Sequence, residues 1–346
     1  MIHIYDLTLT ELEDWFKNAG EPTYRAIQVY QWLYQKRAQS FQDMSNLPRS
    51  LRDKLAESME IVRASEVTRQ VSKVDGTVKF LLQWPDKVTV ETVLMRHDYG
   101  NSVCVSSQVG CKMGCTFCAS TLGGMIRQMT AGEMIEQLLY SQQLLDEQDG
   151  RVSSIVLMGS GEPMDNYDAV MKFIDIVSDV HGLNIGQRHI TISTVGLVPG
   201  IKRLADDGRP ITLAVSLHAP NDELRSAMMP VNKAYPIAKL MEACHYYYNK
   251  TGKRISFEYA LVGGKNDSLA EARELAGLLK GLPSHVNLIP VNYVPERNLV
   301  RTTKNQIYDF WNELKRLGVN ATIRREMGHD ISAACGQLRA EHAKQS

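Results

Sequence analysis

The chain has 346 residues, of which 44% are hydrophobic and 23% are charged, and its formal net charge is +0. This composition excludes a disordered or fibrous protein and predicts one large or two modest globular domains. The first 20 residues carry acids where a signal peptide needs basic residues, and no run of about 18 apolar residues occurs. We therefore expect a cytoplasmic protein without a membrane segment. In that reducing compartment, clustered cysteines bind metal or act in catalysis more often than they form disulfides.

Two stretches of this neutral chain are locally basic. Residues 24–54 contain six Lys or Arg against two acids, and residues 297–325 contain seven against two. Solvated helix faces commonly have this composition, and so do RNA-binding surfaces. Both interpretations stay open on charge alone.

The first 96 residues contain two kinds of pattern. Helical periodicity predicts helices over 10–18, 24–37 and 51–59. Residues 64–95 instead alternate between apolar and polar side chains, as antiparallel strands do. We therefore expect a helical accessory domain at 1–63, a β-strand linker or extension at 64–96, and a larger unit at 97–346.

In the larger unit, short apolar runs alternate with longer helical patterns. Strands that are each followed by a helix are parallel and joined by crossovers, so this unit is a barrel or a doubly wound sheet. The strands are expected at 102–107, 154–158, 189–193, 212–216, 256–260 and 286–290. The helices are expected near 131–148, 166–181, 197–207, 235–250, 268–280 and 303–317.

Three cysteines follow the first strand of the larger unit within eight positions, at Cys111, Cys115 and Cys118. Thiolates at this density bind a soft metal, so zinc and iron–sulfur sites are the two candidates. A structural zinc site needs four ligands, and the nearest further candidates, His97 and Cys104, lie at irregular spacing. Ordinary ferredoxin-type clusters also use four cysteines. Three ligands suit a four-iron, four-sulfur (4Fe–4S) cluster that leaves one iron open.

The spacing Cys-x-x-x-Cys-x-x-Cys after the first strand, with Phe117 before the last cysteine, resembles the radical S-adenosylmethionine (SAM) superfamily. The resemblance implies a partial (βα)6 barrel of the TIM-like type. It also implies that the open iron of the cluster chelates the amino and carboxylate groups of SAM.

Polar residues recur where the other parallel strands end. The turn Met158-Gly-Ser-Gly-Glu-Pro163 ends the second strand, and its small residues are expected to let a ligand approach the backbone. Each such residue alone is more commonly a satisfied polar group than a ligand, but their agreement at equivalent strand ends favours a shared site at the rim. The others are Ser193 after the third strand, Ser216, Leu217 and His218 after the fourth, and Asn292 after the sixth.

Three further cysteines lie outside the loop. Strand alternation places Cys104 on the polar face, opposite Val103 and Val105. Cys335 lies in a tail segment before a glycine, and Cys244 lies within a helix. A buried free cysteine is the ordinary interpretation of each, and for Cys244 we retain it.

Several motifs together resemble the RlmN family of dual-specificity RNA methyltransferases, which is related to the Cfr enzymes. These are Val-Cys-Val-Ser-Ser-Gln-Val-Gly-Cys at 103–111, the 158–163 turn, Ser-Leu-His-Ala-Pro-Asn at 216–221 and Ala-Cys-Gly-Gln-Leu at 334–338. The resemblance covers nearly the whole chain. Ser160 and Ser332 depart from the family pattern, and neither is a residue that the mechanism uses.

The resemblance implies a division of work among the remaining residues. Cys335 is methylated by one SAM, and a radical derived from a second SAM activates that S-methyl group, which adds to C2 of an adenine. Glu91 then accepts the C2 proton, although sequence alone favours an exposed strand carboxylate there, and Cys104 releases the product by forming a transient disulfide with Cys335. The implied SAM-binding residues are Gly161, Glu162, Ser193, Ser216, Leu217, His218 and Asn292.

The implied substrates are an adenosine in the peptidyl-transferase region of 23S rRNA and the adenosine beside the anticodon of tRNAs. The basic N-terminal helices carry Tyr24, Tyr30, Trp32 and Tyr34, so we expect them to contact RNA, with several of these aromatic residues in the core. We further expect a monomer that receives electrons from a small redox protein.

Two alternatives remain open at this point. One is the Cfr-type reaction, which methylates C8, although Glu162-Pro163 favours C2. The other is a zinc-containing RNA-binding protein without catalytic activity.

Overall fold

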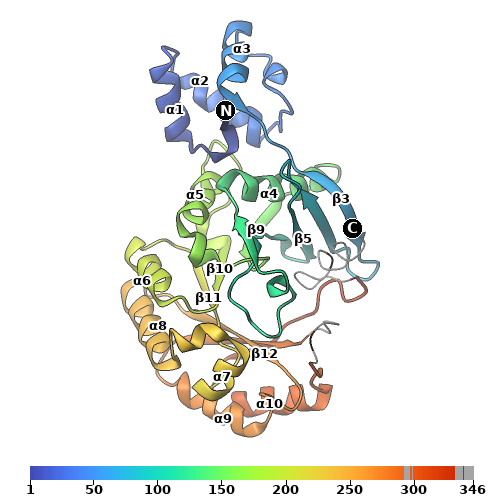
Figure 1. The fold of residues 1–346 in the computed structure, drawn as a ribbon, viewed down its shortest axis with the longest axis vertical. Coiled ribbons are helices and arrows are strands. Elements are labelled where there is room, and N and C mark those ends of the chain that lie inside the picture. Colours follow the sequence, from blue (N-terminus) through green and yellow to red (C-terminus); the bar gives the residue numbers. More distant parts are fainter. Residues whose placement is uncertain (292–296, 298, 332–337, 339–346) are drawn as a thin grey trace.

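A computed structural model of the chain describes residues 1–291, 297, 299–331 and 338. Its long axis runs from the N-terminal helices, through a large sheet, to the helices of the C-terminal half (Figure 1). Among the described residues, no helix combines the length and the apolar character needed to cross a bilayer.

The N-terminal module contains three helices, as the sequence predicts. Thr8 begins the first helix with a capping box, because its hydroxyl accepts the Glu11 amide while the Glu11 carboxylate accepts the Thr8 amide. Two short strands, one at each end of the module, pair in parallel. The elements are β1 (Ile2–His3), α1 (Leu9–Asn18), α2 (Tyr24–Tyr34), α3 (Arg49–Ser58) and β2 (Met59–Glu60).

The module is joined to the rest of the protein by packing and by buried polar contacts. Asp6 Oδ1 accepts a 2.6 Å hydrogen bond from the Gly132 amide, at the start of α4 (Ala131–Asp146). Arg63 pairs at 2.6 Å with the buried Glu136 of the same helix. Because the apolar residues of the module also belong to one continuous core with the sheet and its helices, the two parts pack as one body.

A ten-stranded sheet follows the module. Its strand order is β14-β13-β12-β11-β10-β9-β6-β5-β4-β3, in which the neighbours from β6 to β14 are parallel and the neighbours from β3 to β6 are antiparallel. The 64–96 region therefore extends the main sheet. The strands are β3 (Ser65–Val71), β4 (Val78–Gln83), β5 (Thr89–His97), β6 (Gly100–Cys104), β9 (Val152–Leu157), β10 (Ile190–Thr194), β11 (Thr212–Ser216), β12 (Ile255–Leu261), β13 (Ser284–Pro290) and β14 (Ala321–Ile323).

Helices connect the parallel strands, and the six predicted strand–helix units are confirmed. The structure adds elements that were not predicted from the sequence. They include the short strands β1 and β2, the seventh parallel strand β14, a hairpin of β7 (Gln108–Gly110) and β8 (Met125–Gln128), and the short helix α7 (Asp222–Met228). The remaining helices are α5 (Tyr167–Ser178), α6 (Val198–Asp207), α8 (Ile237–Thr251), α9 (Leu269–Leu278) and α10 (Lys304–Arg316).

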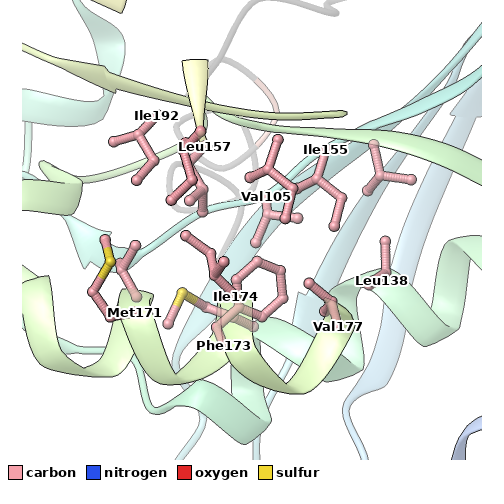
Figure 2. Packing of buried hydrophobic residues seen from close by; sticks show 14 of the residues in the cluster. Val105, Leu138, Ile155, Leu157, Met171, Phe173, Ile174, Val177 and Ile192 are labelled. Atoms are coloured by element: carbon pink, nitrogen blue, oxygen red, sulfur yellow. The ribbon is translucent and has the colours of Figure 1, made fainter. Parts of the chain in front are cut away.

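One face of the parallel sheet forms the main hydrophobic core. Figure 2 shows Ile155 and Leu157 of β9 above Phe173 and Ile174 of α5, and all four are fully buried. Burying a large apolar side chain stabilises a fold by roughly 1.5–3 kcal/mol. Because side chains alternate along a strand, the other face of the same strands is left for the site.

Candidate active site

The second face of the sheet carries polar and sulfur-containing side chains. The strand register aligns Ser216 of β11 with Glu258 of β12, and Glu258 with Asn287 of β13. Glu258 is buried, and its Oε1 accepts a 2.8 Å hydrogen bond from the Asn287 amide. Burial raises the pKa of Glu258 above its ordinary value, and the nearby Arg324 partly opposes the rise. This inner face is therefore a polar surface within the curve of the sheet.

Cys104 lies on the inner face, whereas Val103 and Val105 belong to the main core, a division that strand alternation predicts. The neighbours of Cys104 include Val93 and Met95 of β5, with Val156, Met158 and Met327 packed around them. The environment of this thiol is thus largely apolar and rich in methionine sulfur.

The three-cysteine loop connects β7 and β8. Cys111 and Cys115 are buried, and Cys118 is half-buried. Backbone hydrogen bonds hold the loop at both ends, from the Cys111 amide to the Gly124 carbonyl at 3.0 Å and from the Thr116 amide to the Met228 carbonyl at 2.9 Å. Methionine and valine side chains pack around Cys115. The sequence thereby folds into a shielded loop that presents thiols.

Burial favours the protonated form of two of the loop thiols, Cys111 and Cys115. Burial raises the pKa of Cys111 to about 11. Burial also raises the pKa of Cys115, and the neighbouring Cys118 and Cys111 raise it further. Three soft donors that influence one another's ionisation fit an iron–sulfur cluster, whose positive charge would favour the thiolates. Within the described part of the chain, no three His, Cys, Asp or Glu side chains are arranged to hold a single metal ion.

An aromatic contact joins the cysteine loop to the rim of the barrel. The Phe117 and His218 rings meet edge to face, with their centroids 4.7 Å apart. His218 has a φ of +57°, and its Nδ1 accepts a 2.9 Å hydrogen bond from the Ala260 amide. Burial lowers the pKa of His218 to about 3, and Arg225 contributes to the shift. The imidazole is therefore neutral, and its orientation is fixed by the backbone of β12.

The glycines of the 158–163 turn are required by packing. A Cβ added at Gly159 would lie 2.6 Å from Ser106 Oγ, and one added at Gly161, whose φ is +109°, would lie 2.6 Å from Gln108 Cβ. On the side where a side chain would project, the space beside these glycines is therefore filled by Ser106 and Gln108 and is not open to a ligand. These glycines bring the ends of β6 and β9 together.

Glu162 joins two strand ends. It is 1% exposed, and its two oxygens accept hydrogen bonds from the Met164 and Val195 amides, at 3.1 and 2.8 Å. Burial raises the pKa of Glu162 to about 7, although these hydrogen bonds lower it in part. The carboxyl group therefore couples the turn after β9 to the turn after β10, where Ser193 and Thr194 end that strand.

The sequence analysis missed Arg225, which organises the same rim. This side chain is fully buried, and it donates to the carbonyls of Val195 at 2.6 Å and Leu217 at 3.2 Å and to Asn232 Oδ1 at 2.8 Å. Among the described residues, no carboxylate forms an ion pair with it. Burial lowers the pKa of Arg225 to about 10, while the Cys115 thiol and Asp222 partly oppose this. Nothing in the sequence pattern of 222–228 distinguishes Arg225 from a surface residue.

Glu91 is buried, so the expectation of an exposed strand carboxylate was wrong. It is 5% exposed, and its Oε2 lies 2.9 Å from Nζ of Lys79, which is 0% exposed. Glu91 pairs with Leu81 across the strands, so Lys79 is its diagonal neighbour on the same face. The carboxylate is thus held by a buried cation, two positions along β5 from Val93, which pairs with Cys104.

The structure brings most of the predicted residues to one end and one face of the sheet. These are Cys104 and Glu91 on β6 and β5, the loop thiols, Gly161 and Glu162, and Ser193, Ser216, Leu217 and His218. Ser193 and Ser216 are half-buried, whereas Leu217 is fully buried. Two predicted residues, Asn292 and Cys335, lie outside the described residues.

Comparison with known proteins agrees with this geometry. Residues 2–61 match the family model "Ribosomal RNA large subunit methyltransferase N-terminal domain", and residues 105–279 match "Radical SAM superfamily".

Proteins from two bacteria are similar to almost the whole chain. The "Probable dual-specificity RNA methyltransferase RlmN" of Geobacillus kaustophilus (strain HTA426) is 59% identical over 342 residues, which cover 99% of this chain and 93% of the relative. The protein of the same name from Bacillus cereus (strain B4264) is 57% identical and covers 99% and 94%. A radical SAM methyltransferase structure from Sphaerobacter thermophilus superposes with a TM-score of 0.93, at 46% identity over 97% of this chain and 99% of the other.

Proposed function

Because the chain belongs to the RlmN family of radical SAM RNA methyltransferases, we propose that it methylates C2 of adenosine in 23S rRNA and of the adenosine beside the anticodon in tRNAs. The observation that carries the proposal is the contact between the three-thiol loop and the rim, through Phe117 and His218. This contact makes the loop and the strand ends parts of one site.

Cys111, Cys115 and Cys118 would hold a 4Fe–4S cluster, which together with bound SAM would supply the one-electron chemistry that an electron-poor ring carbon needs. We assign SAM binding to the rim residues Gly161, Glu162, Ser193, Ser216, Leu217, His218 and Asn292. The fixed backbones around Gly161, Glu162 and His218 support this assignment, since preorganised groups bind a ligand without having to be ordered first.

The chain's own residues divide the remaining work. Cys335 carries the methyl group, and its thiol is methylated by one of two SAM molecules used in each turnover. Glu91 accepts the proton from C2, and its ion pair with Lys79 holds the side chain on the inner face. Cys104 then attacks Cys335 and releases the product, leaving a disulfide that a reductant must reopen.

The N-terminal helices are proposed to contact RNA. The predicted mixture of core and surface aromatics is found there: Tyr30 and Tyr34 are buried, whereas Tyr24 is 55% exposed. Arg25 lies 5.0 Å from the centre of the Tyr24 ring, and Lys36 lies 3.9 Å from that of Trp32. The exposed Tyr24 ring and the half-buried Trp32 ring, each beside a cation, suit stacked bases and phosphates. We also propose that the enzyme acts as a monomer and takes its electrons from a small redox protein.

Nucleoside analysis tests the reaction. Anaerobically reconstituted enzyme with SAM and a reductant is incubated with a 23S rRNA fragment or with tRNA, and the digested RNA is examined by mass spectrometry. We expect 2-methyladenosine. A yield of 8-methyladenosine alone would assign the chain to the Cfr-type reaction instead.

Two variants test the division of work between the cysteines. Cys335→Ala should bind SAM yet transfer no methyl group, and Cys104→Ala should accumulate protein covalently joined to RNA. Cys244→Ala is the matched control, because this buried thiol lies in α8 and should leave turnover unchanged. Methyl transfer by Cys335→Ala would refute its role as carrier.

A further inference from the structure

A short stretch of the C-terminal tail is fixed to the hairpin between β3 and β4. Asp330 accepts a 2.6 Å hydrogen bond from the Ser72 hydroxyl and a 2.8 Å hydrogen bond from the Lys73 amide. In the opposite direction, the Gly328 amide donates to Asp75 Oδ2 at 2.8 Å. Each segment therefore supplies a carboxylate that binds the other.

The hairpin side of this contact is preorganised. Ser72 is 3% exposed, and its hydroxyl also accepts the Val74 and Asp75 amides, each at 3.2 Å. Asp75 binds the Thr77 amide with its other oxygen at 2.9 Å. These bonds fix both hairpin groups before the tail binds, so the contact with the tail costs little ordering of the hairpin.

The tail side runs from the inner face to the hairpin. Met327 packs among the residues around Cys104, and the next three residues make the turn that reaches Ser72 and Asp75. Gly328 has a φ of +61°, which a glycine adopts without strain. On the far side of Cys335, Leu338 is buried. The sequence around Cys335 is therefore bounded by two fixed points.

We propose that the reciprocal contacts of Asp330 and Asp75 form a positioning clamp that keeps Cys335 within reach of Cys104 and of the inner face. The proposal rests on the carrier role given to Cys335 above. Cys335 is five positions after Asp330 in the sequence, and an extended chain of that length spans at most roughly 17 Å. In the proposed reaction the Cys335 thiol must meet SAM, the adenine and Cys104 in turn. A short tether keeps its effective concentration high at all three.

Loosening the clamp lengthens the tether by a known amount. Without both carboxylates, the last described contact before Cys335 is the packing of Met327 on the inner face, eight positions away. Effective concentration falls roughly as the −3/2 power of tether length, so a change from five to eight positions predicts about a twofold loss. Asp330→Ala alone leaves Gly328 in place and should have a smaller effect.

Thiol–disulfide exchange with glutathione measures this quantity without turnover. Oxidised glutathione accepts two electrons and becomes two reduced molecules, while the Cys104 and Cys335 thiols each lose a hydrogen and form one disulfide. Anaerobic, cluster-loaded, unmethylated protein is equilibrated with glutathione in the absence of SAM and RNA. The fraction of linked peptides containing Cys104 and Cys335, read by mass spectrometry, gives the effective concentration.

The double variant Asp75→Ala/Asp330→Ala should show the twofold loss, and Ser72→Ala a smaller one. Asp168→Ala, which removes an exposed carboxylate paired with Arg203 on the far helices, should match the parent. Urea unfolding and iron content show whether each variant is folded. An unchanged disulfide equilibrium in the folded double variant would overturn the clamp. A parent protein that forms no Cys104–Cys335 disulfide would instead overturn the carrier mechanism.

Discussion

The two faces of the parallel sheet are built from the same strands but from different chemistry. The outer face presents fully buried aliphatic side chains, such as Ile155, Leu157 and Ile192, to the helices (Figure 2). The inner face presents Ser193, Ser216 and other polar groups, together with Cys104. Strand alternation thus assigns stability to one face and reactivity to the other, so a change on either face should affect mainly one property.

The largest effect on stability is expected on the outer face. Phe173→Ala removes a fully buried ring of α5 that packs below β9. Such substitutions lower the free energy of unfolding by about 3–5 kcal/mol, since they lose apolar burial and leave a cavity. Urea unfolding measures the loss, and SAM affinity of the folded fraction should be unchanged. A strong loss of affinity in the folded fraction would contradict the division between the faces.

The ion pair of Lys79 on β4 and Glu91 on β5 is an exception to the division between the faces, because it lies on the inner face and should affect both stability and activity. Lys79→Met leaves the Glu91 carboxylate buried without this cation, which should lower the free energy of unfolding by about 3 kcal/mol. The double variant Lys79→Met/Glu91→Met should recover most of this stability, because no buried charge remains uncompensated. Neither variant should methylate RNA. If the double variant were as unstable as the single one, the pair would owe its effect to packing rather than to charge.

His218 makes the free energy of unfolding depend on pH. Its folded pKa of about 3 lies below the ordinary value of 6.5, so the unfolded chain binds the proton more readily between these values. The contribution of His218 to stability is complete above pH 6.5 and falls as the pH drops, by roughly 2 kcal/mol at pH 5. The difference in unfolding free energy between the parent and His218→Gln, measured from pH 7.5 to 5, isolates this term. A difference independent of pH would contradict a neutral buried imidazole.

The smallest effect on stability is expected for Ser216→Ala. This half-buried hydroxyl ends β11 on the inner face, and its loss should change the free energy of unfolding by less than about 0.5 kcal/mol. SAM binding, measured by titration calorimetry on the cluster-loaded enzyme, should weaken if the proposed pocket is correct. Thr212→Ala, which removes a half-buried hydroxyl at the other end of the same strand, is the control.

The sequence predicted the elements whose patterns are long and regular. The six strand–helix units and the placement of Cys104 opposite Val103 follow from periodicity, which a single strand or helix determines by itself. The helix α7 and the strand β14 were missed because seven and three residues carry too little periodicity. The Asn221 cap, whose side chain accepts the Leu224 amide, was the available signal for α7.

The site was predictable where a motif is local and less so where it depends on register. The cysteine loop is contiguous, so its spacing indicated a soft-metal site, and its resemblance to the radical SAM pattern favoured an iron–sulfur cluster. The burial of Glu91 depends instead on Lys79, which lies on a neighbouring strand, and the environment of Arg225 is made by carbonyls from three separate segments. Only the folded arrangement brings these groups together.

The firm attachment of the N-terminal helices has a consequence for how substrates are selected. Asp6 and Arg63 fix the module to α4, so the distance between its exposed Tyr24 and the inner face is fixed. If this module binds RNA as proposed, its position relative to the inner face does not change from one RNA to the next. A ribosomal RNA fragment and a tRNA must then each adapt their own conformation so that the target adenine reaches the inner face while the RNA contacts the module.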